Sequence, residues 1–458
     1  MLQRAVVIVL LFSVWLWAPV QGLPVWQRAL AAALTALAGC APVLLLQALQ
    51  GGQMDYATIA RLQVPAGWAL ATLGLALPLV ALRDVLWAGA RLAGAPGAAA
   101  WLHGAVATPL ALLAAALVAA AGVWLALQPP RVHEQPVELA RLPAGLDGLR
   151  VAVLADIHAT PVNDTRFVQT LVERTLAARP DLIVLAGDLV DGDVATTGPH
   201  IAPLAGLQAP LGVWVAPGNH EYYSGYDAWM RHFRSLGLQV LENRSQLLEV
   251  KGARLALSGI GDPAYAQVAR RGSDPLRPQG IAPDVAAVAA QARAARADFH
   301  LLLAHQPRLA HDNAAHGVDL QISGHTHGGQ ILGLDRWLIA RFNNGFVRGL
   351  YPVDGMRLFV SNGAGLWAGF AVRLGVPPRI DILELRRPAS SALKASISTS
   401  CCTLWPTQPH TTPRWSAATS RCWSPRSRWA GRRHPSSSRW AGWWGRCCRP
   451  RPRPRRCR

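Results

Sequence analysis

Short apolar runs that end in Asp, Asn or His constrain this chain more than any other feature. Six of them follow Leu149: RVAVLADIH, DLIVLAGDLVDG, GVWVAPGNHE, FHLLLAHQP, LQISGHTHGG and RLFVSNGAG. Val/Ile/Leu runs bounded by polar or Gly-containing turns are typical of buried strands. Open α/β sheets gather ligand sites at the C-terminal ends of their strands. We therefore expect the polar residues at these ends to converge on one place.

The stretch between the first two runs predicts a helix. Its apolar residues recur at helical spacing behind a cap at Asn163 or Asp164. They are Phe167, Val168, Leu171, Val172 and Leu176. A strand, helix, strand unit follows from this order. Residues 247–250 and 254–260 indicate a hairpin, so the sheet is expected to be mixed.

Two pairs of candidate metal ligands have the same spacing. Asp156 and His158 stand two residues apart, so an extended strand end would project both side chains toward one face. His325 and His327 repeat this spacing in GHTHGG, where the flanking glycines leave room around a metal. An isolated Asp-x-His is more often a surface turn than a metal site. GHTHGG is the most specific single motif.

Three further motifs add oxygen and nitrogen ligands. Asp188 follows a strictly apolar run and a glycine, which suits a carboxylate that bridges two cations. Its neighbour Asp191 is expected either to cap a helix or to orient a ligand. In GNHE, Asn219 offers an amide oxygen to a metal while His220 faces a substrate. Glu221 is expected to support the site or start a helix.

The complete set predicts a dinuclear metal site. His305 ends another apolar run and is followed by Pro307. With nitrogen and oxygen donors and no thiolate, the set favours Mn, Fe, Zn or Co. Two such ions about 3.5–4 Å apart would activate a shared water and polarise a phosphoryl group. The expected ligands are Asp156, His158, Asp188, Asn219, His305, His325 and His327.

The order DIH, GDLVD, GNHE, H and GHTH resembles the calcineurin-like metallophosphoesterase superfamily. The resemblance covers about 240 of the 458 residues. GHTHGGQ and SNGAGLWAGFAVRLGVPPRIDILEL are similar to its bacterial membrane-associated or exported branch, which includes lipid-headgroup and nucleotide-sugar hydrolases. The resemblance implies an α/β fold, a four-layer α/β/β/α sandwich.

The resemblance also implies a role for each site residue. One metal would be held by Asp156, His158, Asp188 and His327. The other would be held by Asp188, Asn219, His305 and His325. His220 would contact the phosphate and protonate the leaving oxygen. The family's usual glycine after the first His is replaced by Ala159-Thr160, which bears on loop shape or substrate access rather than on metal binding.

The N-terminal third predicts an all-α four-helix transmembrane region. Apolar stretches at about 5–20, 29–49, 64–82 and 104–127 each approach the roughly 20 residues that a membrane-spanning helix needs. The first resembles a signal peptide when taken alone, but three more follow and no convincing cleavage site is present. The spans contain no clear ionisable pair, which favours an anchor over a transporter.

The membrane side of the soluble region is nearly undetermined by charge. Four spans place the N-terminus and the region after Arg131 on one side, with Arg4, Arg61, Arg131 and Arg141. The other side carries Arg28, Arg83 and Arg91. This count slightly favours a cytoplasmic catalytic domain on a multi-pass inner-membrane protein.

The basic charge belongs to residues 388–458. That segment holds 15 of the 45 Lys and Arg and no Asp or Glu, so without it the formal net charge falls from +19 to +4. It also contains six of the seven cysteines. We expect it to be disordered. It is either a basic arm for anionic lipid or nucleic acid, or the product of a shifted reading frame, and its composition favours the second. No nucleic-acid partner is expected.

These patterns predict a membrane-anchored, dinuclear metal-dependent phosphoesterase that hydrolyses phosphomonoesters or phosphodiesters. The expected layout is a membrane region at 1–130, a linker at 131–147, the catalytic domain at 148–387 and the tail at 388–458. A cluster near the last His motif is either ordinary core or a sign of lipid-linked or cell-envelope substrates. It comprises Trp337, Leu338, Phe342, Trp367 and Phe370. The alternative is a catalytically inactive binding module, whose mark would be a lost ligand, and none is lost.

Overall fold

The computed structural model describes residues 2–50, 54–271, 280–367 and 371–388. The predictions for the tail after Pro388 and for Phe370 fall outside the described residues. All structural statements below concern the described ranges.

The N-terminal region is helical, as expected. Its helices are α1 (Leu2–Trp17), α2 (Val25–Gln50), α3 (Tyr56–Leu92), α4 (Pro96–Leu102) and α5 (Ala107–Ala126). Three of them contain stretches long and apolar enough to cross a membrane: Val25–Leu45, Arg61–Leu92 and Ala107–Ala126. The first of the four expected spans is a shorter apolar helix, Val6–Trp17.

A polar cluster joins these helices. Arg83 Nε lies 2.7 Å from Asp84 Oδ1, and His103 Nε2 lies 3.0 Å from the same oxygen. Trp15 Nε1 donates to Asp84 Oδ2, and Arg83 Nη1 donates to Thr108 Oγ1. Arg83 and Asp84 lie just after the expected span at 64–82, but the candidate span Arg61–Leu92 is longer and includes this ionisable pair. The sequence shows the two neighbours, and the structure adds His103 and Thr108 to them from other parts of the chain.

The first sheet has six strands in the order β1-β12-β2-β3-β4-β5. They are β1 (Arg131–Glu138), β2 (Arg150–Leu154), β3 (Leu182–Ala186), β4 (Val213–Ala216), β5 (Gln239–Val240) and β12 (Arg379–Arg386). Strands β2 to β5 run parallel, and β12 is antiparallel to β2. The segment 131–147, expected as a linker, contributes β1, which pairs in parallel with β12.

The second sheet also has six strands, in the order β10-β11-β9-β8-β7-β6. They are β6 (Arg244–Val250), β7 (Ala253–Gly259), β8 (Phe299–Leu303), β9 (Leu320–Ser323), β10 (Gly349–Val353) and β11 (Met356–Val360). The strands β7, β8, β9 and β11 run parallel, and the expected hairpin is present as β6 and β7. Both sheets are therefore mixed, with parallel centres.

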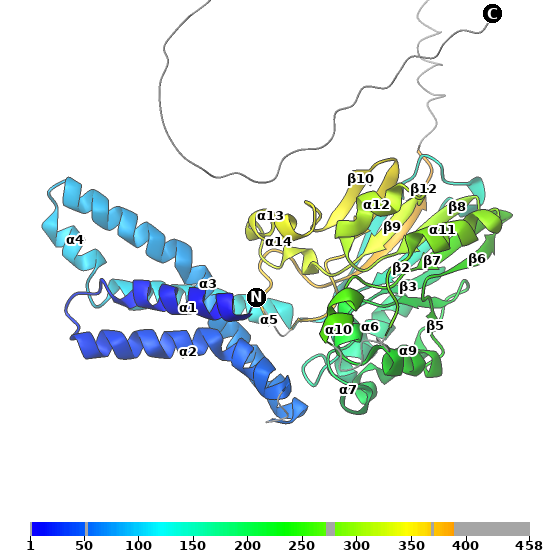
Figure 1. Cartoon of the computed structure of the whole chain (residues 1–458). Helices are drawn as coiled ribbons and strands as arrows, with labels where there is room; N and C mark the ends of the chain where they lie inside the picture. The colour runs from blue at the N-terminus through cyan, green and yellow to red at the C-terminus, as the bar shows by residue number, and fades with distance from the viewer. Residues whose placement is uncertain (1, 51–53, 272–279, 368–370, 389–458) are drawn as a thin grey trace, which may run out of the picture. The chain divides into compact units, whose positions relative to one another are not determined.

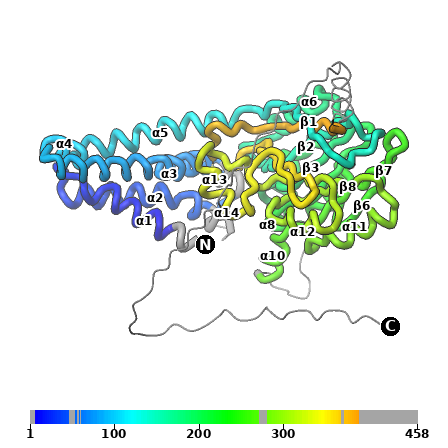
Figure 2. The backbone as a smooth tube through the Cα atoms, turned by 90° about the horizontal axis from the view of Figure 1, so that it is seen from above, coloured from blue at the N-terminus to red at the C-terminus, as the bar shows by residue number. Residues whose placement is uncertain are grey.

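The two sheets pack face to face between helical layers, as the predicted α/β/β/α sandwich requires (Figures 1 and 2). Their facing sides share one apolar cluster, to which β2 contributes Val151 and β7 contributes Leu257. The outer face of the first sheet packs against α6 (Thr165–Ala177), α7 (Val194–Ile201) and α9 (Tyr226–Ser235). The second is covered by α11 (Val285–Ala294) and α12 (Ala310–Ala314).

The two cap candidates before α6 have different roles. Asp164 is the N-cap and accepts hydrogen bonds from two backbone N–H groups of the first turn. The Asn163 amide instead donates to the carbonyls of Ile157, His158 and Leu366. This amide therefore links the loop after β2, at residues 157–158, to Leu366, which lies 203 residues after Asn163.

Leu257 tests the packing between the sheets. It is 0% exposed, so Leu257→Ala should lower the free energy of unfolding by about 2–5 kcal/mol, because the site cannot fully collapse. Denaturant unfolding of the full chain in detergent micelles measures this. The control is Val132→Ala on β1, where the side chain is 38% exposed and the expected change is within about 0.5 kcal/mol. Equal losses in the two variants would contradict the assigned core.

Candidate metal centre

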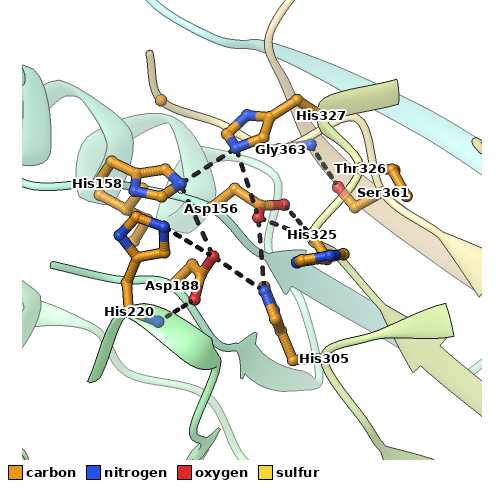
Figure 3. A network of polar contacts seen from close by, with 12 residues as sticks. Asp156, His158, Asp188, His220, His305, His325, Thr326, His327, Ser361 and Gly363 are labelled. Carbon is orange, nitrogen blue, oxygen red and sulfur yellow. Dashed lines mark hydrogen bonds and ion pairs between the residues drawn. The ribbon is translucent and has the colours of Figure 1, made fainter. Parts of the chain in front are cut away.

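The structure brings all seven expected ligands together. Six of them are seen in Figure 3, and Asn219 contacts one of these, His325. Each follows a strand of one of the two sheets: β2, β3 and β4 in the first, β8 and β9 in the second. The side chains are Asp156 and His158 after β2, Asp188 after β3, Asn219 at the start of α8 (Asn219–Tyr223), His305 after β8, and His325 and His327 after β9. Six of them are buried and His325 is half-buried.

The backbone is left-handed at five of these seven positions. The φ angles are 51° at Asp156, 45° at His158, 55° at Asp188, 73° at His325 and 49° at His327. Each such residue costs on the order of 1–3 kcal/mol and persists only where its surroundings determine it. The ligand pairs thus lie in strained loops rather than on the extended strand ends that their spacing suggested.

Hydrogen bonds between neighbouring loops hold this backbone. The N–H groups of Asp156 and His158 donate to the carbonyls of Gly187 and Asp188. The His325 N–H donates to the Asp156 carboxylate at 2.8 Å. The loops from both sheets therefore fix one another.

Glu221 organises the loop around Asp188. Its buried carboxylate accepts hydrogen bonds from the N–H groups of Asp188, Leu189 and Gly218. Burial, together with the nearby Asp188, raises the pKa of Glu221. Glu221 thus supports the site and also lies in the first turn of α8, so both of its expected roles are met.

The first cluster comprises Asp156, His158 and His327. One donor atom from each lies within 4.8 Å of the others. His158 Nε2 is 3.1 Å from His327 Nε2, which in turn is 3.8 Å from Asp156 Oδ1. His158 Nδ1 lies 3.0 Å from Asp191 Oδ1, an arrangement that places the proton on Nδ1 and leaves Nε2 available to a metal.

The second cluster comprises Asp188, His305 and His325. His305 Nδ1 lies 2.6 Å from the Ala186 carbonyl, so it is the donor, and Nε2 points to Asp188 Oδ2 at 3.0 Å. His325 Nδ1 lies 2.8 Å from the Asn219 amide oxygen. Asp188 Oδ2 is also 4.0 Å from Nε2 of His158. Asp188, a member of the second cluster, therefore also lies close to the first.

The ionisable groups of the site strongly perturb one another. Burial raises the pKa of Asp156. Burial also opposes the charge of Asp188, but His305 and His220 hold its pKa well below the usual range. Burial is the largest single influence on His305 and lowers its pKa, but Asp188, Asp156 and Asp262 together raise this pKa to about 10. Burial and His305 lower the pKa of His325 to about 3. Such opposed shifts in one place are typical of a functional centre.

The donor set fits divalent transition metals. It offers imidazole nitrogens and carboxylate and amide oxygens, and residues 148–387 contain no cysteine. Within the described residues, His305 Nε2 is buried and makes no hydrogen bond of good geometry, although Asp188 lies nearby. A buried nitrogen aimed at a carboxylate in this way suits a ligand to a cation.

Asp191 orients two histidines rather than capping a helix. The N-cap of α7 is Asp193, which accepts from the Thr196 N–H. Asp191 Oδ1 contacts Nδ1 of both His158 and His220. Burial lowers the pKa of His220, but Asp191 and Asp188 raise it to about 10. The His220 side chain is 20% exposed, and its Nε2 is 3.9 Å from Asp188 Oδ2. The His220 side chain is therefore accessible to a substrate at the edge of the site.

Arg373 is a site residue that the sequence motifs missed. It is 2% exposed and donates to the carbonyls of Asn362 and Gly365. Its Nη2 lies 3.2 Å from His327 Nδ1. Burial lowers its pKa to about 10. The available signal was a single arginine within the apolar run AVRLGV.

Gly218 tests the loop around Asp188. A Cβ at this position would overlap the carboxylate and the backbone nitrogen of Asp188. Gly218→Ala should therefore weaken metal affinity about 10–100-fold, as loss of support around a ligand does. Metal content after dialysis against a metal buffer measures this. Gly198→Ala is the control, because its nearest neighbour, His232 Nε2, would be 3.5 Å away. Unchanged metal content in Gly218→Ala would refute the placement of Asp188.

The chain is similar to a known family and to several known proteins. Residues 149–329 match the family model of the calcineurin-like phosphoesterases. An uncharacterized metallophosphoesterase of Aquifex aeolicus is 30% identical over 260 residues, which are 56% of this chain and 92% of that protein. A Danio rerio transmembrane protein with a metallophosphoesterase domain is 32% identical over 280 residues, 60% of each chain.

Other matches show how much of each protein the similarity covers. An uncharacterized Helicobacter pylori metallophosphoesterase is 30% identical over 58% of this chain. The chain spans 66% of that protein's length and 60% of the Danio rerio protein's. The solved calcineurin-like phosphoesterase YfkN of Bacillus subtilis has 17% identity and a TM-score of 0.34, over 48% of this chain and 82% of its own. The relatives at 30% identity and above decide the assignment. The chain belongs to the calcineurin-like metallophosphoesterase family.

Proposed function

We propose that this protein is a membrane-anchored phosphoesterase that uses two divalent metal ions to hydrolyse phosphate monoesters or diesters. The position of Asp188 carries the proposal, because its carboxylate belongs to one cluster of candidate metal ligands and lies 4.0 Å from His158 Nε2 of the other. Two-metal sites of this kind hold the attacking and leaving oxygens of a displacement at phosphorus. Family membership supports the same reaction class.

The clusters suggest how the ligands divide between the ions. One ion would be held by Asp156, His158, Asp188 and His327, and the other by Asp188, Asn219, His305 and His325. The donors favour Mn, Fe, Zn or Co. When bound, the ions would lower the pKa of a shared water and neutralise charge on the phosphate.

His220 is the proposed proton donor. Asp191 fixes its Nδ1, and the His220 backbone N–H donates to Asp188 Oδ1, so both ring and backbone are positioned. Its Nε2 lies 3.9 Å from Asp188 Oδ2, and from there it would protonate the leaving oxygen of an ester bound at the two ions. Asp191 acts through His158 and His220 and is a positioning residue.

The surroundings of the centre support a lipid-linked or cell-envelope substrate. Leu366 packs against Ala126 of α5, with Val64 of α3 beside them. The next residue, Trp367, stacks on His327 with the ring centres 6.3 Å apart. Two consecutive residues, Leu366 and Trp367, thus connect the ends of the apolar helices to the candidate ligand His327. An ester whose leaving group lies at a membrane surface would fit this site.

We further propose a multi-pass inner-membrane location. Three candidate spans support it, as do the relatives from Danio rerio and Bos taurus that are named transmembrane proteins. Whether α1 also spans decides if the N-terminus and the catalytic domain share a side. Four spans and the arginine count slightly favour the cytoplasm.

Loss of a ligand should abolish hydrolysis. Asp188→Ala and His325→Ala should each reduce the turnover of an aryl phosphate by at least about 10³-fold, because charge stabilisation at the phosphate is lost. The assay uses detergent-purified full chain with Mn, Zn, Fe or Mg. His311→Ala, at an exposed position paired with Asp354, is the control. Full activity in Asp188→Ala would refute the site. A metal-loaded wild type inactive on phospholipids, nucleotide-sugar lipids and nucleotides would favour the binding module.

The role of His220 as proton donor is tested by comparing esters that have different leaving groups. His220→Ala should lower kcat about 10²–10⁴-fold for an alkyl phosphate, whose leaving oxygen needs a proton, and less for an activated aryl phosphate. Metal content should match wild type, because His220 is assigned to neither ion. An equal loss on both esters would remove His220 from the role of proton donor, and a loss of metal would make it a ligand.

A further inference from the structure

Exposed apolar side chains are concentrated in one short segment of the sandwich domain. Between residues 131 and 388, eight large apolar side chains are exposed among the described residues, and five of them fall within residues 332–342. These five, here called the apolar patch, are Leu332, Leu334, Trp337, Leu338 and Phe342. Trp337 is 72% exposed and Phe342 is 70% exposed. A contiguous exposure of this kind marks an interaction surface.

The patch stands on a well-defined base. It lies on α13 (Leu334–Trp337) and α14 (Ile339–Phe342), which stand outside the two sheets (Figure 1). The buried Asp335 carboxylate accepts from the N–H groups of Gly333 and Arg336 and pairs with Arg348. Arg348 also donates to the carbonyl of Gly328, within the GHTHGG motif. The patch is therefore tied to the loop of the metal centre.

The base of the patch continues into the apolar helices. Ile331 pairs with Leu374, and both pack in one cluster with Ala71 of α3 and Ala119 of α5. Ala119 lies seven residues before the end of the candidate span Ala107–Ala126, which is about 10 Å along a helix. A bilayer that covers this span to its end therefore reaches the level of the patch.

The charges around the patch suit a lipid surface. Residues 331–348 contain three arginines and one acidic residue, Asp335, which is buried and paired. Arg336 and Arg341 are exposed beside the patch side chains. At membrane borders, tryptophan rings lie at headgroup level and arginines extend toward the phosphates. Anionic headgroups would complement this surface.

We propose that the apolar patch inserts into the bilayer interface as a second attachment, beside the helices. The insertion holds the GHTHGG loop at a set depth relative to the membrane surface. This inference rests on the proposed membrane anchoring, but it does not depend on hydrolysis.

The test measures the depth of single positions in the full chain. The native cysteines are changed to serine, and Trp337→Cys or Phe342→Cys is labelled with a polarity-sensitive fluorophore. The protein is reconstituted in phosphatidylethanolamine/phosphatidylglycerol vesicles that contain nitroxide-labelled lipid. The matched control is Glu249→Cys on β6, at an exposed position. Retained metal content shows that each variant is folded.

The labels at 337 and 342 should show a blue-shifted emission and several-fold stronger quenching by nitroxide lipid than the label at 249. Arg336→Gln with Arg341→Gln should weaken this quenching when phosphatidylglycerol is present. If the quenching at 337 and 342 equals that at 249 in protein that still floats with the vesicles, insertion of the apolar patch is refuted and membrane anchoring by the helices stands. Protein that does not float would overturn the anchor. A blue shift that rises with protein concentration without lipid quenching would overturn the proposal in favour of a second copy of the chain.

Discussion

The carboxylate of Asp188 is the constraint on which the rest of this structure depends. It follows a strand of the first sheet, yet its Oδ2 lies 3.0 Å from His305 Nε2, which follows a strand of the second. A buried carboxylate is costly unless it is paired and hydrogen-bonded. The surrounding loops meet that requirement with imidazoles and backbone N–H groups. The same arrangement leaves donor atoms that suit cations.

The packing of the two sheets sets the geometry of the centre. Neither sheet alone carries all the residues of either cluster: Asp156, His158 and Asp188 follow strands of the first sheet, and His305, His325 and His327 follow strands of the second. The apolar cluster between the sheets therefore fixes distances within the metal centre as well as stability. The left-handed backbone at five ligands is maintained by bonds between these loops, which offset its strain.

The segment after β11 relates the centre to the apolar helices. Leu366 packs on α5, Trp367 stacks on His327, and the Arg373 N–H donates to the Gly122 carbonyl of α5. The two contacts with α5 join residues about 240 to 250 positions apart in the chain. The metal centre, the helices and the apolar patch are thus connected through a few residues, which is the physical basis for proposing that catalysis takes place at a membrane surface.

The sequence by itself determined strands β2, β3, β4, β8, β9 and β11, the β6–β7 hairpin, helix α6, the apolar helices and which Asp, Asn and His residues come together, because local periodicity or a short motif indicates each of them. It could not show that residues 131–138 form a strand: the run RVHEQPVE is polar, and its pairing partner β12 lies about 250 residues later. The left-handed ligands, the role of Arg373 and the cluster around Asp84 were also decided only by the tertiary structure. In each case the determining contact comes from a distant part of the chain. Burial and charge pairing that arise from such contacts leave no pattern in the local sequence.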